Sequence, residues 1–166
     1  MEPYTAFDDA LAAYVAGPEM LDAALAGLTE SGFGQRIASG EWSVREIVQH
    51  VAEGDLMWGE CLKVAIVQPG FTWPLDWYVG NDPFASALRY DARALGPTLA
   101  LFRAHRLYIA EMLRHLPDVR EHTLTVSWPW VAAPHTFTVA TIVAMQARHV
   151  VRHCAEITAI RARHGD

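Results

Sequence analysis

Residues 44–67 form the most sharply bounded segment of the chain, and they constrain its fold more than any other stretch. Ser43 and Glu46 have the spacing of a capping box, in which each residue accepts a hydrogen bond from the backbone amide of the other. Such a cap contributes about 1 kcal/mol. Pro69-Gly70 ends the segment. A helix of this length needs other helices to cover its apolar stripe, which favours a bundle.

The first part of the chain also predicts helix. Residues 5–30 are rich in alanine and leucine, which favour helix. Gly17-Pro18 interrupts them, and proline is accepted in the first turn of a helix. We therefore expect a new helix to start at this point and to run to about Thr29.

Two more helices are predicted in the second half. From Pro83 to about Leu116 an apolar pattern with three- and four-residue spacing returns. Because Gly96-Pro97 lies inside it, the pattern predicts either two helices or one with a kink. The residues of the pattern are Leu95, Leu99, Phe102, Arg106, Ile109 and Leu113. The last helix is expected from Thr138 to about Arg163.

Two connecting regions differ from the helices. Residues 68–83 hold three prolines, two glycines and two tryptophans, which predict a long irregular crossover loop. Residues 122–138 alternate polar and apolar side chains, which predicts a short strand or an extended loop. We therefore expect an all-α chain in one domain, residues 1–166, folded as a four-helix bundle with a long crossover loop and a short extended segment before the last helix.

Five of the six tryptophans are expected mostly to pack in the core. Those in the two connecting regions can border a site for an apolar or aromatic compound. The residues are Trp58, Trp73, Trp77, Trp128 and Trp130.

Composition narrows the classes of partner. The 166 residues are 52% hydrophobic and 19% charged, which is typical of a globular domain. The formal net charge of -6 disfavours nucleic acid and anionic membranes as partners. No apolar stretch approaches the roughly 18 residues of a membrane span, and the acidic start of the chain does not resemble a signal peptide. We expect a cytoplasmic protein.

A pair of histidines in the last predicted helix points to chemistry. His149 and His153 are four residues apart, so their side chains share one helix face. Two imidazoles so placed can bind one metal ion. Burying them without partners costs about 1–3 kcal/mol each, and a shared metal would supply partners. The alternative is a pair of histidines that are hydrogen-bonded to their neighbours. The same face carries Ile142, Met145, Gln146, Ile157 and Ile160.

A third histidine, His50, lies in the middle of the helix predicted at 44–67. Gly54 follows one turn later, although a glycine inside a helix costs up to about 1 kcal/mol. We interpret this glycine as making space beside His50 for a ligand or a closely packed helix. The remaining histidines lack a paired spacing and are expected to be structural or at the surface. They are His105, His115, His122, His135 and His164.

Acidic and thiol side chains were considered as further members of a site. Glu46 and Glu53 are the nearest acids on the His50 face, and either can orient an imidazole or act as a base. For Glu46 the helix cap is the favoured role. Glu53 is retained as a candidate base, with a solvated helix edge as the alternative. Cys61 and Cys154 are expected to be buried thiols and not ligands.

Two short motifs resemble those of the DinB/YfiT-like family. Residues 42–51 read Trp-Ser at a helix start with a histidine eight residues after the tryptophan, and His149 and His153 with Ile157 resemble the closing motif. The resemblance implies a four-helix bundle, commonly a homodimer. It also implies a site for nickel, zinc or a similar divalent ion with His50, His149 and His153 as ligands. Related families use low-molecular-weight thiols such as mycothiol or bacillithiol.

Three histidines would leave a position open on the metal, and an open position is the mark of a catalytic site. The first hypothesis is therefore a metal-dependent enzyme for a small-molecule substrate, either a thiol-dependent S-transferase or a hydrolase. The second is a non-catalytic metal- or ligand-binding stress-response protein on the same scaffold. The third is a structural bundle without a metal.

Overall fold

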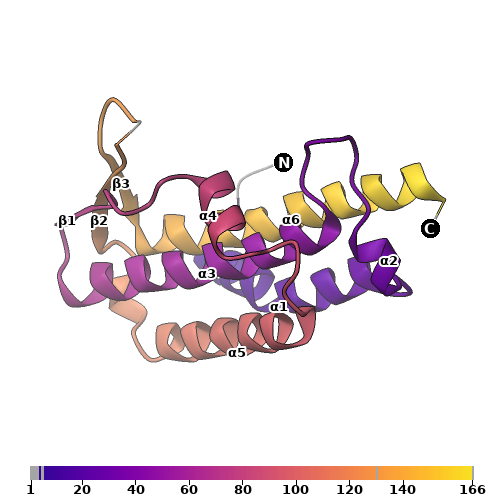
Figure 1. Ribbon diagram of the computed structural model, residues 1–166. Helices are drawn as coiled ribbons and strands as arrows, with labels where there is room; N and C mark the ends of the chain where they lie inside the picture. The colour runs from indigo at the N-terminus through magenta and orange to yellow at the C-terminus, as the bar shows by residue number, and fades with distance from the viewer. Residues whose placement is uncertain (1–3, 5, 130, 166) are drawn as a thin grey trace.

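Four long helices form the body of the molecule in the computed structural model, which describes residue 4, residues 6–129 and residues 131–165 (Figure 1). They are α1 (Phe7–Leu25), α3 (Val44–Val67), α5 (Leu95–Arg114) and α6 (Val139–His164). The shorter elements are α2 (Glu30–Phe33), β1 (Phe71–Pro74), α4 (Asn81–Ala87), the 3₁₀ turn Pro117–Val119, β2 (Thr123–Ser127) and β3 (His135–Thr138). The predicted four-helix bundle is confirmed, and none of the described helices is both long and apolar enough to cross a membrane.

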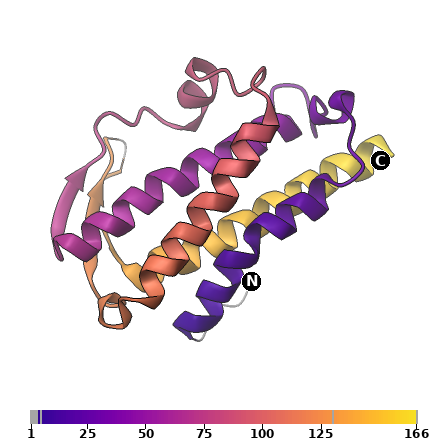
Figure 2. The same ribbon diagram turned by 90° about the horizontal axis from the view of Figure 1, so that it is seen from below.

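The order and direction of the helices explain the crossover. α1 and α3 each pack against both α5 and α6. α1 and α6 run in one direction, and α3 and α5 run in the opposite one (Figure 2). Because α3 and α5 are parallel, the chain between them has to return along the bundle. The long connection predicted after residue 67 makes this return, and it carries β1 and α4.

A small sheet caps one end of the bundle. Its strand order is β1-β2-β3, with β1 parallel to β2 and β2 antiparallel to β3. Strand β2 alternates as expected, and its Leu124 and Val126 are buried. The prediction of an irregular loop over residues 68–83 was wrong at β1. The partner of β1 is β2, about 50 residues later in the chain. No local sequence pattern therefore predicts the pairing.

Helix α1 is continuous through Gly17-Pro18, so the predicted break there was wrong. Proline has no N–H, which leaves the carbonyl of Tyr14 without its helical donor. Arg106 on α5 supplies one, because its Nη1 donates to that oxygen at 2.6 Å. Gly17 makes room for this guanidinium, since a Cβ at this position would lie 2.1 Å from Nη1. Gly17 and Pro18 suggest a helix end in the sequence, but in the structure they allow the side chain of Arg106 to pack against α1.

We expect Gly17→Ala to lower the free energy of unfolding by about 2–3 kcal/mol, because the added methyl group overpacks a buried guanidinium that cannot move away freely. Urea unfolding measures the change. Gly96→Ala is the matched control, since a Cβ there meets nothing within 4 Å. It should change stability by less than about 1 kcal/mol. Equal effects of the two substitutions would contradict this account of Gly17.

The segment predicted as helical from Pro83 to Leu116 is two helices, one of the two alternatives. The break falls at residues 88–94, before Gly96-Pro97 and not at it. Gly96 and Pro97 lie in the first turn of α5, where proline's missing N–H costs nothing.

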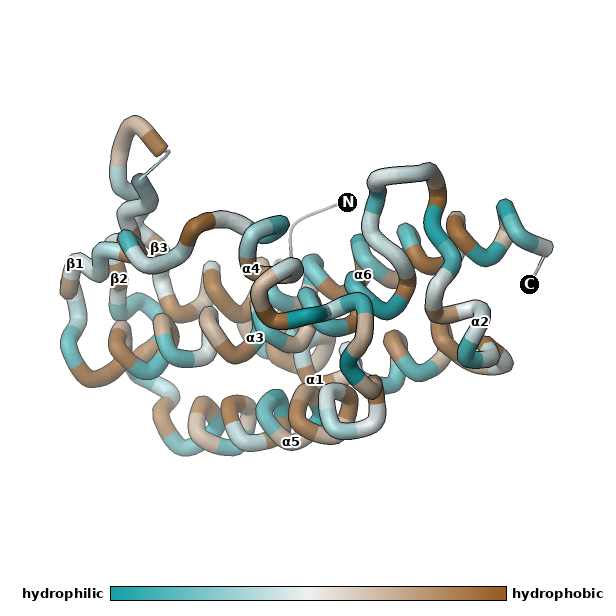
Figure 3. Tube along the Cα trace, viewed as in Figure 1, coloured by the Kyte–Doolittle hydropathy of each residue, from teal (hydrophilic) through white to brown (hydrophobic). Residues whose placement is uncertain are grey.

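The core consists of two apolar clusters with polar residues between them. Hydrophobic residues recur at intervals along the long helices (Figure 3). One cluster lies toward the sheet and includes Ile109, and the other includes Phe102 toward the opposite end. On α5, Arg106 separates these two residues. Arg106 therefore lies where the two clusters meet.

Candidate metal centre

Three histidine side chains converge between α3 and α6. The Nε2 of His149 lies 3.1 Å from Nε2 of His50 and 3.0 Å from Nε2 of His153. One ligand atom from each of the three lies within 4.8 Å of the others. Nitrogens bound to a single tetrahedral zinc ion are about 3.3 Å apart. The structure therefore brings together the three residues singled out from the sequence, at a spacing that can hold one metal ion.

The protonation of these rings suits metal binding. Burial, followed by nearby positive charge, lowers the pKa of His50 to about 3 and that of His149 to about 2. Burial also lowers the pKa of His153. At neutral pH the rings are therefore uncharged, and each has one nitrogen lone pair to offer. A cation at the meeting point of the Nε2 atoms would satisfy all three, which is the fit that a divalent metal requires.

Glu156 fixes the orientation of one ring. The Nδ1 of His153, which is 4% exposed, donates to Oε2 of Glu156 at 2.7 Å. This bond places the proton on Nδ1 and leaves Nε2, which lies beside His149, with a lone pair that can bind a metal or accept a hydrogen bond. Glu156 was not among the residues predicted for the site, although its position three residues after His153 is a recognisable helical spacing.

Replacing Glu156 with alanine should weaken metal binding by about 10–100-fold, the usual effect of removing a carboxylate that orients a histidine ligand. Titration calorimetry with Zn²⁺ measures the affinity. Glu111→Ala is the control, because Glu111 makes a similar contact with the exposed His115 at 3.6 Å. Unchanged zinc affinity in Glu156→Ala would show that Glu156 has no role at the centre.

Gly54 brings the two histidine-bearing helices close together. A Cβ on Gly54 would lie 3.4 Å from Cε1 of His149. Gly54 was predicted to make space beside His50 for a ligand or a closely packed helix. The imidazole ring of His149 on α6 occupies this space. On the other side, the Trp42 ring meets His50 edge-on at a centroid distance of 4.8 Å. Trp42 is held in turn by Asp82, which accepts from its Nε1 at 3.0 Å.

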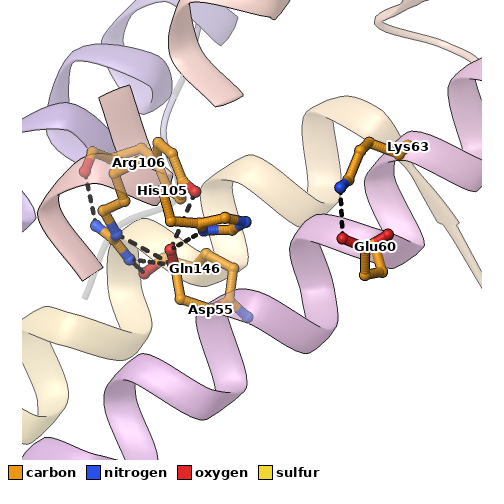
Figure 4. A network of polar contacts seen from close by, with 7 residues as sticks. Asp55, Glu60, Lys63, His105, Arg106 and Gln146 are labelled. Carbon is orange, nitrogen blue, oxygen red and sulfur yellow. Dashed lines mark hydrogen bonds and ion pairs between the residues drawn. The ribbon is translucent and has the colours of Figure 1, made fainter. Parts of the chain in front are cut away.

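A buried ion pair joins α3 to α5 (Figure 4). Asp55 on α3 is 1% exposed and Arg106 on α5 is 0% exposed. Oδ1 of Asp55 accepts from Nε and Nη2 of Arg106 at 3.1 and 2.8 Å. Its Oδ2 accepts from the hydroxyl of Tyr14 at 3.1 Å, and Nδ1 of His105 lies 3.0 Å away. The carboxylate is therefore fully hydrogen-bonded, as a buried charge must be.

These contacts connect all four long helices. Besides Tyr14 on α1 and Asp55 on α3, Arg106 also donates through Nη2 to the carbonyl of Gln146 on α6 at 2.9 Å. Burial and the charge of Asp55 raise the pKa of Tyr14, so its hydroxyl stays a donor. Asp55 lies five residues after His50, and Gln146 three before His149. The network therefore fixes how α3 and α6 face each other at the three histidines.

A cavity of about 620 Å³ opens beside the histidines. His50 and His149 line it, as do Glu53, Gln146 and Arg152. Oε1 of Glu53 accepts from Nη1 of Arg93 at 3.1 Å. Of the five tryptophans considered, Trp58, Trp77 and Trp128 line this cavity and Trp73 lies elsewhere. Trp130 lies outside the described residues.

The other residues considered from the sequence have structural roles. Glu46 closes the capping box, since it accepts from the amide of Ser43 at 2.8 Å. Cys61 is buried in the apolar cluster near the sheet, and burial raises the pKa of its thiol to about 12. The expectation that Cys154 is buried was wrong, because this thiol at the edge of the other apolar cluster is only partly buried; it also stands outside the metal-ligand cluster found among the described residues. His105 is buried against Asp55, a structural role within the expectation for that residue.

Comparisons with known proteins identify the family of this scaffold. The sequence model of the DinB superfamily matches residues 13–157. No curated protein sequence matches significantly. YfiT from Bacillus subtilis, described as a probable metal-dependent hydrolase with an unusual four-helix bundle topology, superposes with a TM-score of 0.85 at 18% identity, covering 99% of this chain and 94% of that one. The mycothiol-dependent maleylpyruvate isomerase gives a TM-score of 0.61 at 16% identity, covering 92% of this chain and 60% of that one.

Proposed function

This chain belongs to the DinB superfamily, and from that premise we propose that it is a metal-dependent enzyme for small organic molecules, with a divalent ion held by His50, His149 and His153. The observation that carries the proposal is the convergence of three uncharged imidazoles, two of which, His50 and His149, line a cavity of about 620 Å³. Three nitrogen ligands suit nickel and zinc, and also copper and iron. A structural zinc site would have four protein ligands.

The residues around the centre have separable tasks. The side of the cluster formed by His50 and His149 faces the cavity, so an incoming ligand reaches the centre from there. A divalent ion held by the three histidines would supply Lewis acidity, which would lower the pKa of water or a thiol so that either could act as a nucleophile at neutral pH. Glu53 borders the same cavity with Oε1 held by Arg93. We assign its other oxygen to accept the proton of the nucleophile.

Two kinds of reaction fit this arrangement. YfiT is described as a probable metal-dependent hydrolase, and the more distant relative as a mycothiol-dependent isomerase. Hydrolysis with water and transfer to a low-molecular-weight thiol differ only in the nucleophile that enters the cavity. The homodimer implied by the resemblance stays a prediction, which light scattering during size-exclusion chromatography tests.

The test compares stripped and reloaded protein. Metal is removed with a chelator, the protein is reloaded with Ni²⁺ or Zn²⁺, and esters and electrophiles are offered with water, mycothiol, bacillithiol or glutathione. We expect about one ion per chain and turnover only after reloading, with a large loss of kcat in Glu53→Gln. Protein that binds the ion and gains thermal stability but turns over none of these substrates would favour the non-catalytic alternative. Protein that refuses both metals would contradict the proposal altogether.

A further inference from the structure

One third of the residues that line the cavity beside the histidines are aromatic. Six aromatic side chains from α3, the crossover, α4, the following turn and the region after β2 face it, and such rings favour flat apolar ligands. They are Trp58, Trp77, Tyr78, Phe84, Tyr90 and Trp128. A cavity of this size is large enough for a compound with one or two rings.

The charged residues that line this cavity differ in how closely they are paired with an opposite charge. Glu53 is paired with Arg93, and Glu60 is paired with Lys63. Arg152 on α6 is different, because its side chain is 62% exposed and its nearest carboxylate oxygen, on Glu156, is 3.9 Å away. Its Nη2 donates instead to Nε2 of His153 at 2.9 Å. Among the described lining residues, the cation at Arg152 therefore has the weakest ionic partner.

Arg152 and a metal compete for the same lone pair. When Nε2 of His153 serves as a ligand, it can no longer accept a hydrogen bond from the guanidinium. The guanidinium is also repelled by a dication close to it. Its long side chain can turn into the cavity that it already lines, where it would meet an anion.

Gln146 adds a second polar group at the same place. It is 4% exposed and borders the cavity, one turn before His149. Its Oε1 has no hydrogen-bond partner among the described residues. A buried amide oxygen without a donor is costly, and a hydrogen-bond donor on the body of a ligand, as distinct from its carboxylate, would relieve it. The cavity thus combines aromatic side chains with the guanidinium of Arg152 and with the amide oxygen of Gln146, which has no donor among the described residues.

We propose that this cavity binds a small organic anion, with its flat apolar body between the aromatic side chains and its carboxylate, or a similar group, paired with Arg152. The inference rests on the proposed function for its placement beside the metal, and it adds the class of substrate. Arg152 is the residue that selects charge, because a guanidinium pairs with a carboxylate through two parallel hydrogen bonds and not with a neutral amide.

The experiment uses two probes of the same shape, 2-naphthoate and its neutral amide, 2-naphthamide. Binding to metal-loaded protein is followed by tryptophan fluorescence and by calorimetry. We expect naphthoate to bind about tenfold more tightly than naphthamide. Arg152→Gln should weaken naphthoate binding about tenfold and leave naphthamide binding within about twofold. The control Arg163→Gln, eleven residues further along α6 at an exposed position, should change neither.

Two other results separate this inference from the proposed function. If metal binds but Arg152→Gln weakens both probes equally or neither of them, the anion site is wrong while the metal site stands. If elemental analysis finds no metal but the preference for naphthoate persists and depends on Arg152, the anion site stands and the metal-dependent function fails. Equal affinity of the wild-type protein for the two probes would also overturn the anion site.

Discussion

Replacing Asp55 with alanine is expected to lower the free energy of unfolding by about 3–5 kcal/mol, which is the usual cost of removing one partner of a buried ion pair. The substitution leaves the guanidinium of Arg106 charged and without its carboxylate at a position that water does not reach. It also removes the acceptor of the Tyr14 hydroxyl. Urea unfolding monitored by circular dichroism measures the loss.

Two further variants make the result interpretable. Tyr14→Phe removes a single hydrogen bond to Asp55 and should cost only about 1 kcal/mol. Asp91→Ala breaks an exposed pair with Arg89 and should cost less than about 0.5 kcal/mol. If Asp55→Ala cost no more than Asp91→Ala, the network would not be what holds the four helices in register.

Replacing His149 with alanine is expected to weaken metal binding by at least about 100-fold, more than the loss of an orienting carboxylate. His149 is the central member of the cluster, since its Nε2 lies close to Nε2 of both other histidines. Its removal leaves two ligands on different helices. Elemental analysis after dialysis and zinc titration measure the effect.

His115→Ala is the matched control, because His115 is 74% exposed near the end of α5 and stands outside the cluster. This variant should retain its metal. Because alanine at position 149 removes a partly buried polar ring, the fold itself should persist, which circular dichroism checks. Full metal occupancy in His149→Ala would refute the assignment of the ligands.

The features that sequence reasoning identified correctly are encoded locally. Helix α3 begins and ends where the capping box of Ser43 and Glu46 and the Pro69-Gly70 pair predict. The shared face of His149 and His153 follows from helical geometry alone. His50 was joined to them through a resemblance between motifs, and the packing of α3 against α6 brings it within reach.

The features that were missed depend on contacts between distant parts of the chain. Gly17-Pro18 indicates a helix end until Arg106, about 90 residues away, donates to the freed carbonyl. An arginine within the apolar stripe of α5 was the available signal, and it indicates a buried charge in need of a partner. Nothing near Asp55 in the sequence marks it as that partner. Strand β1 likewise pairs with a strand about 50 residues later.

X-ray absorption spectroscopy of the zinc- or nickel-loaded protein is the most direct test of whether three histidines bind the metal, because it reports the atoms around the ion. We expect nitrogen and oxygen atoms at about 2.0–2.1 Å from the metal, with scattering from three imidazole rings in the wild-type protein and from two in His50→Ala. A sulfur neighbour at about 2.3 Å, or a spectrum without imidazole scattering, would contradict a centre built from His50, His149 and His153.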